Sequence, residues 1–581
     1  MARKPLSDYL ATYRKKIDTS KRWRKEEGYD QIWKRMSDLY RGRHYEYYSE
    51  SDRLLVNICF STVNVIVPSV AVNYPKITVN ATQPESAAQA VIDEAVVNYW
   101  WRHNNIKDEF KQAVKDMIIC GHGWIKVGYR YVEEESFNID GDDVSDDVEG
   151  GETTPRTVVV EDAPFAERVS PSDVFVDPDA TSMKDIAWIA QRIRRPLREV
   201  RTDKRYNKAA REAVGAMAIS RYGDDPSVRK VRDKDEGYAE IWEFYDVKNR
   251  LMCVFAEAGD GFLVKPMKMP YSFGQPFVML RDYDVPDQFY PIGELEAIEP
   301  LQKELNETRT QMMNHRKRFA RKWLYKESAF DQLGRTALES DEDNVMVPVV
   351  GDDALGNVIA PMPAVINPAD FYNQSNVISA DIDRVSGVSE FMRGGVSEIR
   401  RTATESALLQ DAANARTADK LATVERGIAE VGRRLLILAQ QFMTGEQVAR
   451  ITAKSGEPVW VKYDRDYLAG DFDFEVVGGS TQPVNESFRR QQALQIVDAM
   501  APFAGAGVVD MGKLAAYVLQ FGFGVKSPEQ FLQAAPPPQP PVGQPALPSG
   551  EMGGVPIPPA NPTVPQQAEA GMAGFDQSLQ A

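Results

Sequence analysis

Apolar residues recur at helical spacing along three long segments in the second half of the chain. The first segment, from Gly293 to Lys326, reads as one helix. Its apolar stripe consists of five residues at heptad-like spacing, namely Ile298, Leu301, Leu305, Met312 and Phe319. Roughly 27 helical residues at about 1.5 Å each extend about 40 Å, more than an ordinary globular helix needs. We therefore expect this helix to be a strut that packs in a bundle or a ring.

Charges of opposite sign divide the strut. Acidic residues fill its first half, namely Glu294, Glu296, Glu299, Glu304 and Glu307. Basic residues crowd its second half, namely Arg309, Arg316, Lys317, Arg318, Arg321, Lys322 and Lys326. Acid at the start and base at the end of a helix are stabilised by the helix dipole. Taken alone, the segment also fits an amphipathic core helix with solvated charges.

Two further helices follow the strut. A strand-like interval around Val345–Val350 separates it from a second helix, which starts at Asn367-Pro368 and stops at Gly387. Two long helices thus flank one small β-type insertion. After a glycine-rich segment, the capping box Thr402–Glu405 opens a third helix that runs to about Phe442.

The first half of the chain shows the pattern of a mixed α+β domain. Helical patterns cover Leu6–Tyr48, Ala87–Trp101 and Lys107–Cys120, and Pro196 opens another helix to about Ala218. Strand patterns occupy six stretches: Trp124–Val132, Arg156–Val160, Val169–Ala180, Tyr238–Val247, Arg250–Ala256 and Gln275–Tyr283.

The end of the chain changes character. The segment Trp460–Val477 returns to strand-like alternation and should rejoin the sheet of the first domain. Shorter helices are predicted at Glu486–Ala501, Met511–Phe521 and Pro528–Ala534. From Ala535 the composition shifts to Pro, Gln, Gly and Ala, which cannot bury enough apolar area to order the chain. We expect a disordered tail.

Two stretches of the first half have alternative interpretations. Aromatic and basic residues interleave in Leu6–Tyr48, a pattern that can bind single-stranded nucleic acid by stacking, although an amphipathic helix on a domain core is favoured. The tract Glu133–Glu152 carries five aspartates that could hold a hard cation. It lacks the ligand spacing of an EF-hand, which favours a solvated acidic loop.

Length, charge and cysteine content exclude several classes of protein. A chain of 581 residues predicts two or three domains, and a net charge of −16 argues against a wide basic surface for nucleic acid. The three separated cysteines, Cys59, Cys120 and Cys253, indicate neither a zinc ribbon nor a disulfide framework. The charged N-terminus lacks the apolar region of a secretory signal. Asparagines and a proline interrupt the uncharged segment Leu54–Pro75, so no membrane span is expected.

The sequence contains no recognisable catalytic motif. No phosphate-binding loop, H-E-x-x-H or G-x-S-x-G motif occurs. The four histidines are far apart, and only His122, between two glycines, has a suggestive context; a packed or exposed turn histidine is favoured there. We therefore predict no enzymatic activity, no cofactor and no metal site.

Several stretches carry a family resemblance. They are VNICFSTVNVIVPSVAVNYPKITV, DMIICGHGWIKVGY, VSPSDVFVDPDA, FYPIGELEAIEPLQKELNETRTQMMNHRKR, SGVSEFMRGG and RRTATESALLQDAANAR. In this order, and with the pattern of helix, β insertion, helix and long helix, the chain resembles the portal, or head-to-tail connector, family of tailed bacteriophages. It is most similar to the portals of short-tailed phages. The resemblance covers roughly Leu6–Ser480.

The resemblance implies an architecture. The fold class would be α+β: a ring, typically of twelve subunits, with a mixed α/β wing, a stem of long helices, a small α/β clip inserted between stem helices, and a helical C-terminal crown. The implied divisions are wing 1–290, stem helices 291–319 and 368–386, clip 320–367, tunnel-facing loop 387–401, long helix 402–443, strands returning to the wing 444–482, crown 483–534 and disordered tail 535–581.

The resemblance also implies a function and partners. Such a ring occupies one capsid vertex of the virion, after synthesis in the host cytoplasm, and double-stranded DNA is packaged and ejected through it. Expected partners are the terminase large subunit, head-tail adaptor and tail proteins, the major capsid and scaffolding proteins, and transient non-specific double-stranded DNA, with no membrane. Candidates for facing the DNA channel are Arg393, Arg400 and Arg401. Candidates for docking terminase or adaptor are Arg316, Lys317, Arg318, Arg321 and Lys322. A capsid scaffold or adaptor without a channel is the alternative.

Overall fold

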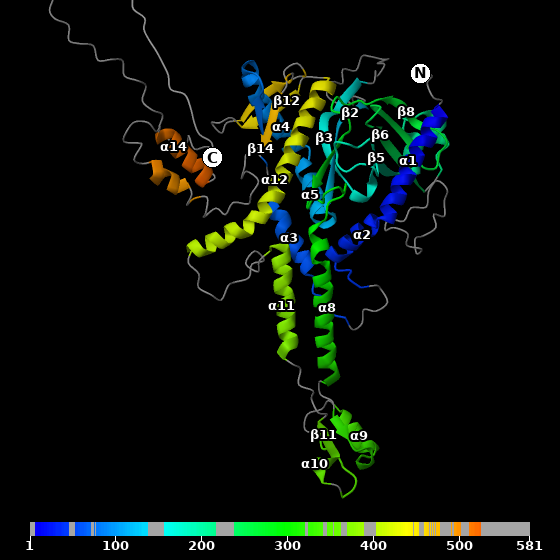
Figure 1. Cartoon of the computed structure of the whole chain (residues 1–581), viewed down its shortest axis with the longest axis vertical. Coiled ribbons are helices and arrows are strands. Elements are labelled where there is room, and N and C mark those ends of the chain that lie inside the picture. Colours follow the sequence, from blue (N-terminus) through cyan, green and yellow to red (C-terminus); the bar gives the residue numbers. More distant parts are fainter. Residues whose placement is uncertain are drawn as a thin grey trace, which may run out of the picture. The chain divides into compact units, whose positions relative to one another are not determined.

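The structure is a computed structural model of the chain (Figure 1). It describes residues 6–45, 53–70, 75, 77–136, 156–215, 237–319, 323–340, 345–352, 354–361, 369–388, 403–444, 447–452, 458–463, 465, 468, 470, 472–476, 490, 493–500 and 511–523.

A five-stranded antiparallel sheet lies in the first half of the chain. Its strands, in spatial order, are β4 (Val174–Val176), β5 (Trp188–Pro196), β6 (Tyr238–Asp246), β7 (Leu251–Ala256) and β8 (Phe262–Lys268). Helix α1 (Leu6–Glu26) packs on this sheet, with Tyr13 and Ile17 in one buried cluster with Trp242 and Phe244. The aromatic residues of α1 therefore serve the core, as the amphipathic interpretation predicts.

A three-stranded sheet of order β3-β2-β9 lies beside a group of helices. Its strands are β2 (His122–Ser136), β3 (Arg156–Val169) and β9 (Phe277–Arg281). The helices nearby are α2 (Tyr29–Tyr40), α3 (Ile58–Val70), α4 (Ala87–His103) and α5 (Ile106–Cys120), with the short turns η2 (Pro84–Ser86) and η3 (Pro171–Asp173). The predicted β2–β3 hairpin and the end of α5 at Gly121, which has a φ of 87°, are confirmed. Residues 137–155, including all five aspartates of the acidic tract, lie outside the described residues.

Three long helices follow the sheets. They are α8 (Glu294–Phe319), α11 (Ala369–Ser386) and α12 (Ala403–Phe442). Helices α8 and α11 contact each other and run side by side (Figure 1). Ile298 of α8, Ile382 of α11 and Ile428 of α12 are fully buried in one cluster with Ile118 of α5. The long helices therefore share a hydrophobic core with the first half of the chain.

The segment between α8 and α11 differs from the prediction in two ways. The helix predicted to reach Lys326 ends at Phe319, because Trp323–Tyr325 forms strand β10 and pairs with β11 (Ile359–Pro361). The stretch Val345–Val350 is irregular rather than a regular strand. The insertion also contains helical elements that the sequence did not indicate: η4 (Glu327–Ala329), α9 (Gln332–Glu339) and α10 (Leu355–Val358).

The helix predicted from Pro196 to Ala218 is broken. It consists of α6 (Leu197–Thr202) and α7 (Lys208–Glu212), because Asn207 caps a new helix by accepting a hydrogen bond from the Ala210 N–H. Strand β8 was missed, and residues 216–236 are outside the described residues.

The strands after α12 do not join either large sheet. β14 (Phe472–Val476) pairs with β1 (Ile77–Ala81) in a sheet of two strands, and β12 (Gln447–Thr452) pairs with β13 (Pro458–Tyr463) in another. The expectation that this segment rejoins the main sheet is therefore wrong, although β14 does return to the first half. Further on, residues 493–500 are helical, and α14 (Met511–Tyr517) is followed by the π-helical turn Val518–Gly522. The predicted helix at Pro528–Ala534 and the tail from Ala535 fall outside the described residues.

Candidate functional site

The paired helices α8 and α11 are built around a narrow apolar seam. Ile298, Leu305 and Met312 of α8 are buried, and Leu301 is half-buried. Among the residues of α11 whose exposure the structure describes, 373–386, the buried ones are Ser375, Ile378, Ile382 and Ser386, at the spacing of one helix face. Phe319 ends α8, and its side chain is outside the described part. Within the described residues, most of the other side chains of the two helices are polar or exposed.

Three polar side chains on α8, Gln302, Asn306 and Thr310, form hydrogen bonds with the backbone of residues 54–58; we call this row the polar ladder. The Gln302 carboxamide accepts from Ile58 N (3.0 Å) and donates to Val56 O (2.7 Å), and Asn306 Oδ1 accepts from Val56 N (3.0 Å). One turn further, Thr310 Oγ1 accepts from Leu54 N (3.0 Å). Because Gln302 and Asn306 are buried, these bonds satisfy backbone groups that would otherwise be costly to bury. The ladder fixes the first half of the chain to α8.

His44 completes this ladder. Its Nδ1 lies 2.8 Å from Asn306 Nδ2, and its Nε2 lies 2.9 Å from Leu39 O. A neutral ring with the proton on Nε2 satisfies both contacts, because the amide donates to Nδ1 and Nε2 donates to the carbonyl. Burial is the main cause that lowers the pKa of His44 and keeps the ring neutral. Sequence reasoning missed this contact, since the partners lie far apart along the chain.

The start of α8 meets the α5–β2 turn at two glycines in close contact. A Cβ on Gly121 would lie 2.3 Å from Pro291 O, and a Cβ on Gly293 would lie 2.7 Å from Gly121 N. Only glycine fits at either position, and Gly121 also has a left-handed φ of 87°. We call this contact, Gly121 with Pro291–Gly293, the glycine joint.

A buried ion triad lies beside the glycine joint. Lys420 of α12 forms ion pairs with Asp282, which follows β9, and with Glu294 (3.1 Å), the first residue of α8. All three side chains are nearly inaccessible to solvent. Tyr283 donates to Glu294 (2.9 Å), and its ring lies 3.8 Å from the Lys420 ammonium. The triad thus joins three separate parts of the chain.

Two carboxylates share one ammonium in this triad. Burial raises the pKa of Asp282 to about 7, with Glu294 adding to the shift and Lys420 opposing it. Burial alone would lower the pKa of Lys420, but the two carboxylates outweigh it and the pKa is raised. The ammonium is therefore charged at every pH at which the protein is expected to work, and its loss would leave two buried carboxylates without a compensating cation.

His122 is a packed core histidine rather than a catalytic one. Its ring is fully buried among Trp33, Trp124 and Tyr290, with centroid distances of 4.7, 6.2 and 4.9 Å. Burial, aided by the nearby Arg24 charge, lowers its pKa to about 3. This agrees with the packed alternative that the sequence favoured.

His122 should make the fold sensitive to acid. The pKa is depressed in the folded state, so the unfolded chain binds one more proton between about pH 3 and 6.5, and stability falls as pH drops through this window. We expect His122→Phe, which keeps the aromatic packing, to flatten the loss of stability between pH 6.5 and 4. Urea denaturation at both pH values measures it. An unchanged difference between the two pH values would contradict the assignment.

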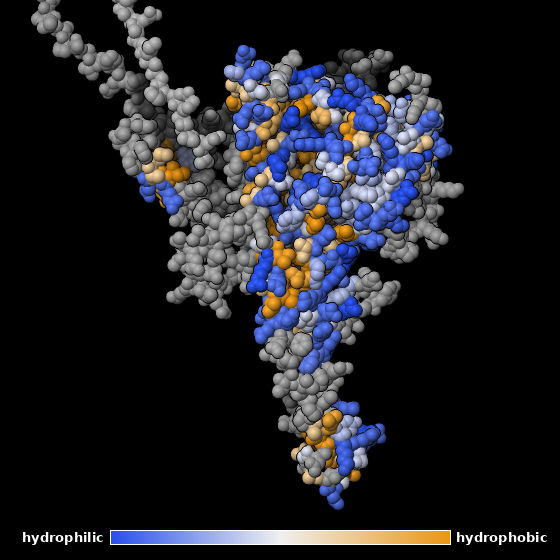
Figure 2. Space-filling model, in the orientation of Figure 1, coloured by the Kyte–Doolittle hydropathy of each residue, from blue (hydrophilic) through white to orange (hydrophobic). Residues whose placement is uncertain are grey.

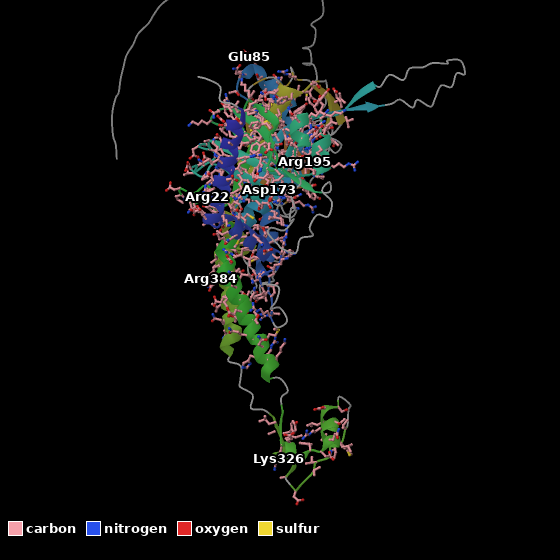
Figure 3. All side chains as sticks on the ribbon, turned by 90° about the vertical axis from the view of Figure 1, so that its right-hand side faces the viewer. Arg22, Glu85, Asp173, Arg195, Lys326 and Arg384 are labelled. Carbon is pink, nitrogen blue, oxygen red and sulfur yellow. The ribbon has the colours of Figure 1, made fainter. Side chains whose placement is uncertain are left out.

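Three of the five basic docking candidates lie at the end of α8. Arg316 and Lys317 are exposed on its last turn, and Arg318 is helical in backbone. Arg321 and Lys322 lie outside the described residues, as do the channel candidates Arg393, Arg400 and Arg401. Figure 3 labels two further basic residues: Arg384 on α11, which pairs with Asp381 (3.0 Å), and Lys326 in the insertion.

The described part of the chain shows no group of side chains arranged as a metal site. Within it, no three His, Cys, Asp or Glu side chains are grouped as metal ligands. None of the described helices combines the length and the apolar composition needed to span a membrane. The three cysteines are free, and two of them, Cys59 and Cys253, are buried.

Comparison with known proteins identifies the family. A chain in "Virion of native gene transfer agent (GTA) particle" matches with a TM-score of 0.41 and 11% identity, over 83% of this chain and 92% of that one. A chain in "Neck of native GTA particle computed with C12 symmetry" matches with a TM-score of 0.34 and 12% identity, over 79% and 89%. The sequence matches none of the curated proteins compared with it. The family model "Phage P22-like portal protein" matches residues 10–520. The chain therefore belongs to the P22-like portal protein family of phages.

Proposed function

We propose that this portal protein forms a closed ring, typically of twelve subunits, whose channel passes double-stranded DNA during packaging and ejection. The observation that carries the proposal is the family match over residues 10–520. The contacting long helices α8 and α11 with an insertion between them support it. As a member of a family of structural proteins, the chain is a component of the virion at the portal vertex. We propose further that it has no enzymatic activity of its own.

The division of the chain into wing, stem, clip, tunnel-facing loop and crown is part of this proposal. In it, α8 and α11 form the stem and the insertion forms the clip. The negative net charge of −16 suits a channel that must let DNA slide, because each phosphate contact adds salt-dependent affinity and drag. A few placed arginines would touch phosphates without reading bases.

A triple substitution tests the proposed contact of Arg393, Arg400 and Arg401 with DNA. If they face the channel, replacing all three with alanine should reduce the DNA packaged or retained per particle while rings still assemble. The measurement is the DNA content of purified particles, with Arg384→Ala on α11 as a surface arginine control. Normal DNA content in the triple variant would contradict the assignment.

Charge reversal at the basic end of α8 tests whether this surface binds the terminase large subunit. Reversing the charges of Arg316, Lys317 and Arg318 should weaken binding of the terminase large subunit and leave the helical content unchanged, because Arg316 and Lys317 are exposed. The effect should shrink at high salt. Binding measured by surface plasmon resonance at two salt concentrations checks this. Undiminished terminase binding would exclude this surface and leave the adaptor as the candidate partner.

A further inference from the structure

The far ends of strands β2 and β3 form a two-stranded ribbon. Beyond Lys126, the last residue of β2 that pairs with β9, the only described strand paired with β2 is β3. The pairing shifts register after Val132 and leaves Val160 as a bulge. Residues 133–136 and 156–159 continue past the bulge as four residue pairs, which we call the ribbon end. Figure 3 shows these strand ends, in cyan, with no third strand beside them.

The base of the ribbon is anchored to the rest of the fold. Asp162 accepts hydrogen bonds from the Tyr129 hydroxyl and from the Thr444 hydroxyl (3.0 Å), and Arg130 pairs with Glu161 (3.1 Å). Past the bulge, the described residues show no hydrogen bond or ion pair between the ribbon end and a third element. Because two strands alone are marginally stable in water, the ribbon end would gain from a third strand.

The two edges of the ribbon end differ in how they are protected. The β2 edge carries three consecutive glutamates at residues 133–135, and charge on an edge strand opposes pairing with other chains. The β3 edge reads TVVV over residues 157–160 and carries no charge. Val159 is 47% exposed and Val160 is 58% exposed, and threonine and valine favour strands. The β3 edge is therefore open to an added strand.

The charge around the ribbon end selects the kind of segment that fits this edge. Polar and charged residues cover most of the described surface seen in Figure 2, so charge alone does not single out a binding surface. Around the ribbon end the charge has one sign, since residues 131–162 include twelve acidic residues and one basic residue. Val159 lies directly opposite Glu133, so the two side chains share one face of the ribbon. A long basic side chain on an added strand can cover Val159 with its stem and reach Glu133 with its charged end.

The same charge excludes other occupants. The phosphates of nucleic acid would be repelled by the acidic residues. The ribbon end of another copy carries the same glutamates, and like charges opposite each other across strands destabilise the pairing. The basic strand β5 of another copy is not free to add here, because it already pairs with β4 on one side and β6 on the other. The occupant is therefore a segment of a different protein.

We propose that the edge of β3 at residues 157–160 binds an extended basic segment of a partner protein, which adds to the ribbon end as a third strand. Main-chain hydrogen bonds to β3 give the affinity, and Lys or Arg side chains that face Glu133 and Glu135 give the specificity. This surface does not depend on the ring of the proposed function, because all of its residues belong to one chain.

N-methylated peptides test strand addition in the full-length protein. The probe is a fluorescein-labelled octapeptide of alternating lysine and valine. Two derivatives with the same charge carry backbone N-methyl groups, one on every lysine and the other on every valine, so that each derivative loses the donors of one edge. We expect one derivative to bind about tenfold more weakly than the parent in fluorescence anisotropy and the other to bind within about twofold, since an added strand uses one edge.

Hydrogen exchange and a pair of matched variants locate the site. The parent peptide should slow exchange of the backbone amides of residues 156–160 and leave β8, an edge strand of the five-stranded sheet, unchanged. Val159→Lys combined with Val160→Lys places charge on the open edge and should weaken binding about tenfold or more. Met267→Lys, at a position 46% exposed on β8, should leave binding unchanged. Unchanged thermal unfolding of both variants confirms that they fold.

Four outcomes would overturn the inference. Absence of binding by the parent peptide at low salt would remove the site, and equal binding of the two derivatives would show attraction by charge alone. Protection of β8 in place of residues 156–160 would assign the peptide to another edge. Slow exchange at residues 156–160 without peptide, lost on dilution to monomers, would assign the edge to another copy of this chain. The ring of the proposed function would stand in every case.

Discussion

Replacing Lys420 by alanine is expected to lower the free energy of unfolding by about 3–5 kcal/mol. The substitution leaves Asp282 and Glu294 buried at the start of α8 with no cation to compensate them. Removing one partner of a buried ion pair is far more costly than removing the whole group, because the remaining charge keeps its desolvation penalty. Urea denaturation of the full-length protein measures the change.

Two comparisons make the Lys420 prediction specific. Arg384→Ala removes an exposed pair with Asp381 and should change stability by no more than about 0.5 kcal/mol. Lys420→Met combined with Asp282→Asn should be less destabilising than the sum of the single changes, because the partners are coupled. A Lys420→Ala protein as stable as Arg384→Ala would show that the triad does not join α12 to α8.

Gly121→Ala is expected to disrupt the glycine joint, at a cost of about 3 kcal/mol or more. The new Cβ would lie 2.3 Å from the backbone oxygen of Pro291, which cannot move aside as a side chain can, and φ is 87°. Gly293→Ala meets backbone at 2.7 Å without a left-handed φ, so it isolates the clash. Thermal unfolding of each variant gives the measurement.

Gly28 supplies the matched control for the joint. Its φ is 77°, but a Cβ there would meet nothing within 4 Å, so Gly28→Ala carries backbone strain alone and should cost about 1 kcal/mol. The expected order of destabilisation is Gly121→Ala, then Gly293→Ala, then Gly28→Ala. If Gly121→Ala and Gly28→Ala had equal effects, close packing at the joint would be refuted.

Local patterns account for the parts of the fold that the sequence predicted well. The periodic apolar positions of α11 and α12, the turn at Gly121 and the alternation of β2 all arise from neighbours along the chain. The extension of α8 to Lys326 failed because pairing of Trp323–Tyr325 with Ile359–Pro361 overrides local helical preference.

The long-range contacts that join these elements could not be predicted from the local sequence pattern. Asn306 meets His44, and Lys420 meets Asp282, across more than a hundred residues in each case. One signal was present: Gln302, Asn306 and Thr310 repeat at four-residue spacing beside the apolar stripe of α8, and polar side chains that are buried at such positions must form hydrogen bonds within the protein. The pattern did not reveal that the partner was the backbone of Leu54–Ile58.

The central claim is that this portal protein closes into a ring around a channel. Negative-stain imaging of the purified full-length protein, with native mass spectrometry to count subunits, tests it most directly. We predict rings of about a dozen subunits with a central hole, as the family resemblance implies. Monomers or open filaments under all conditions of salt and concentration would contradict the account and favour a scaffold or adaptor that encloses no channel.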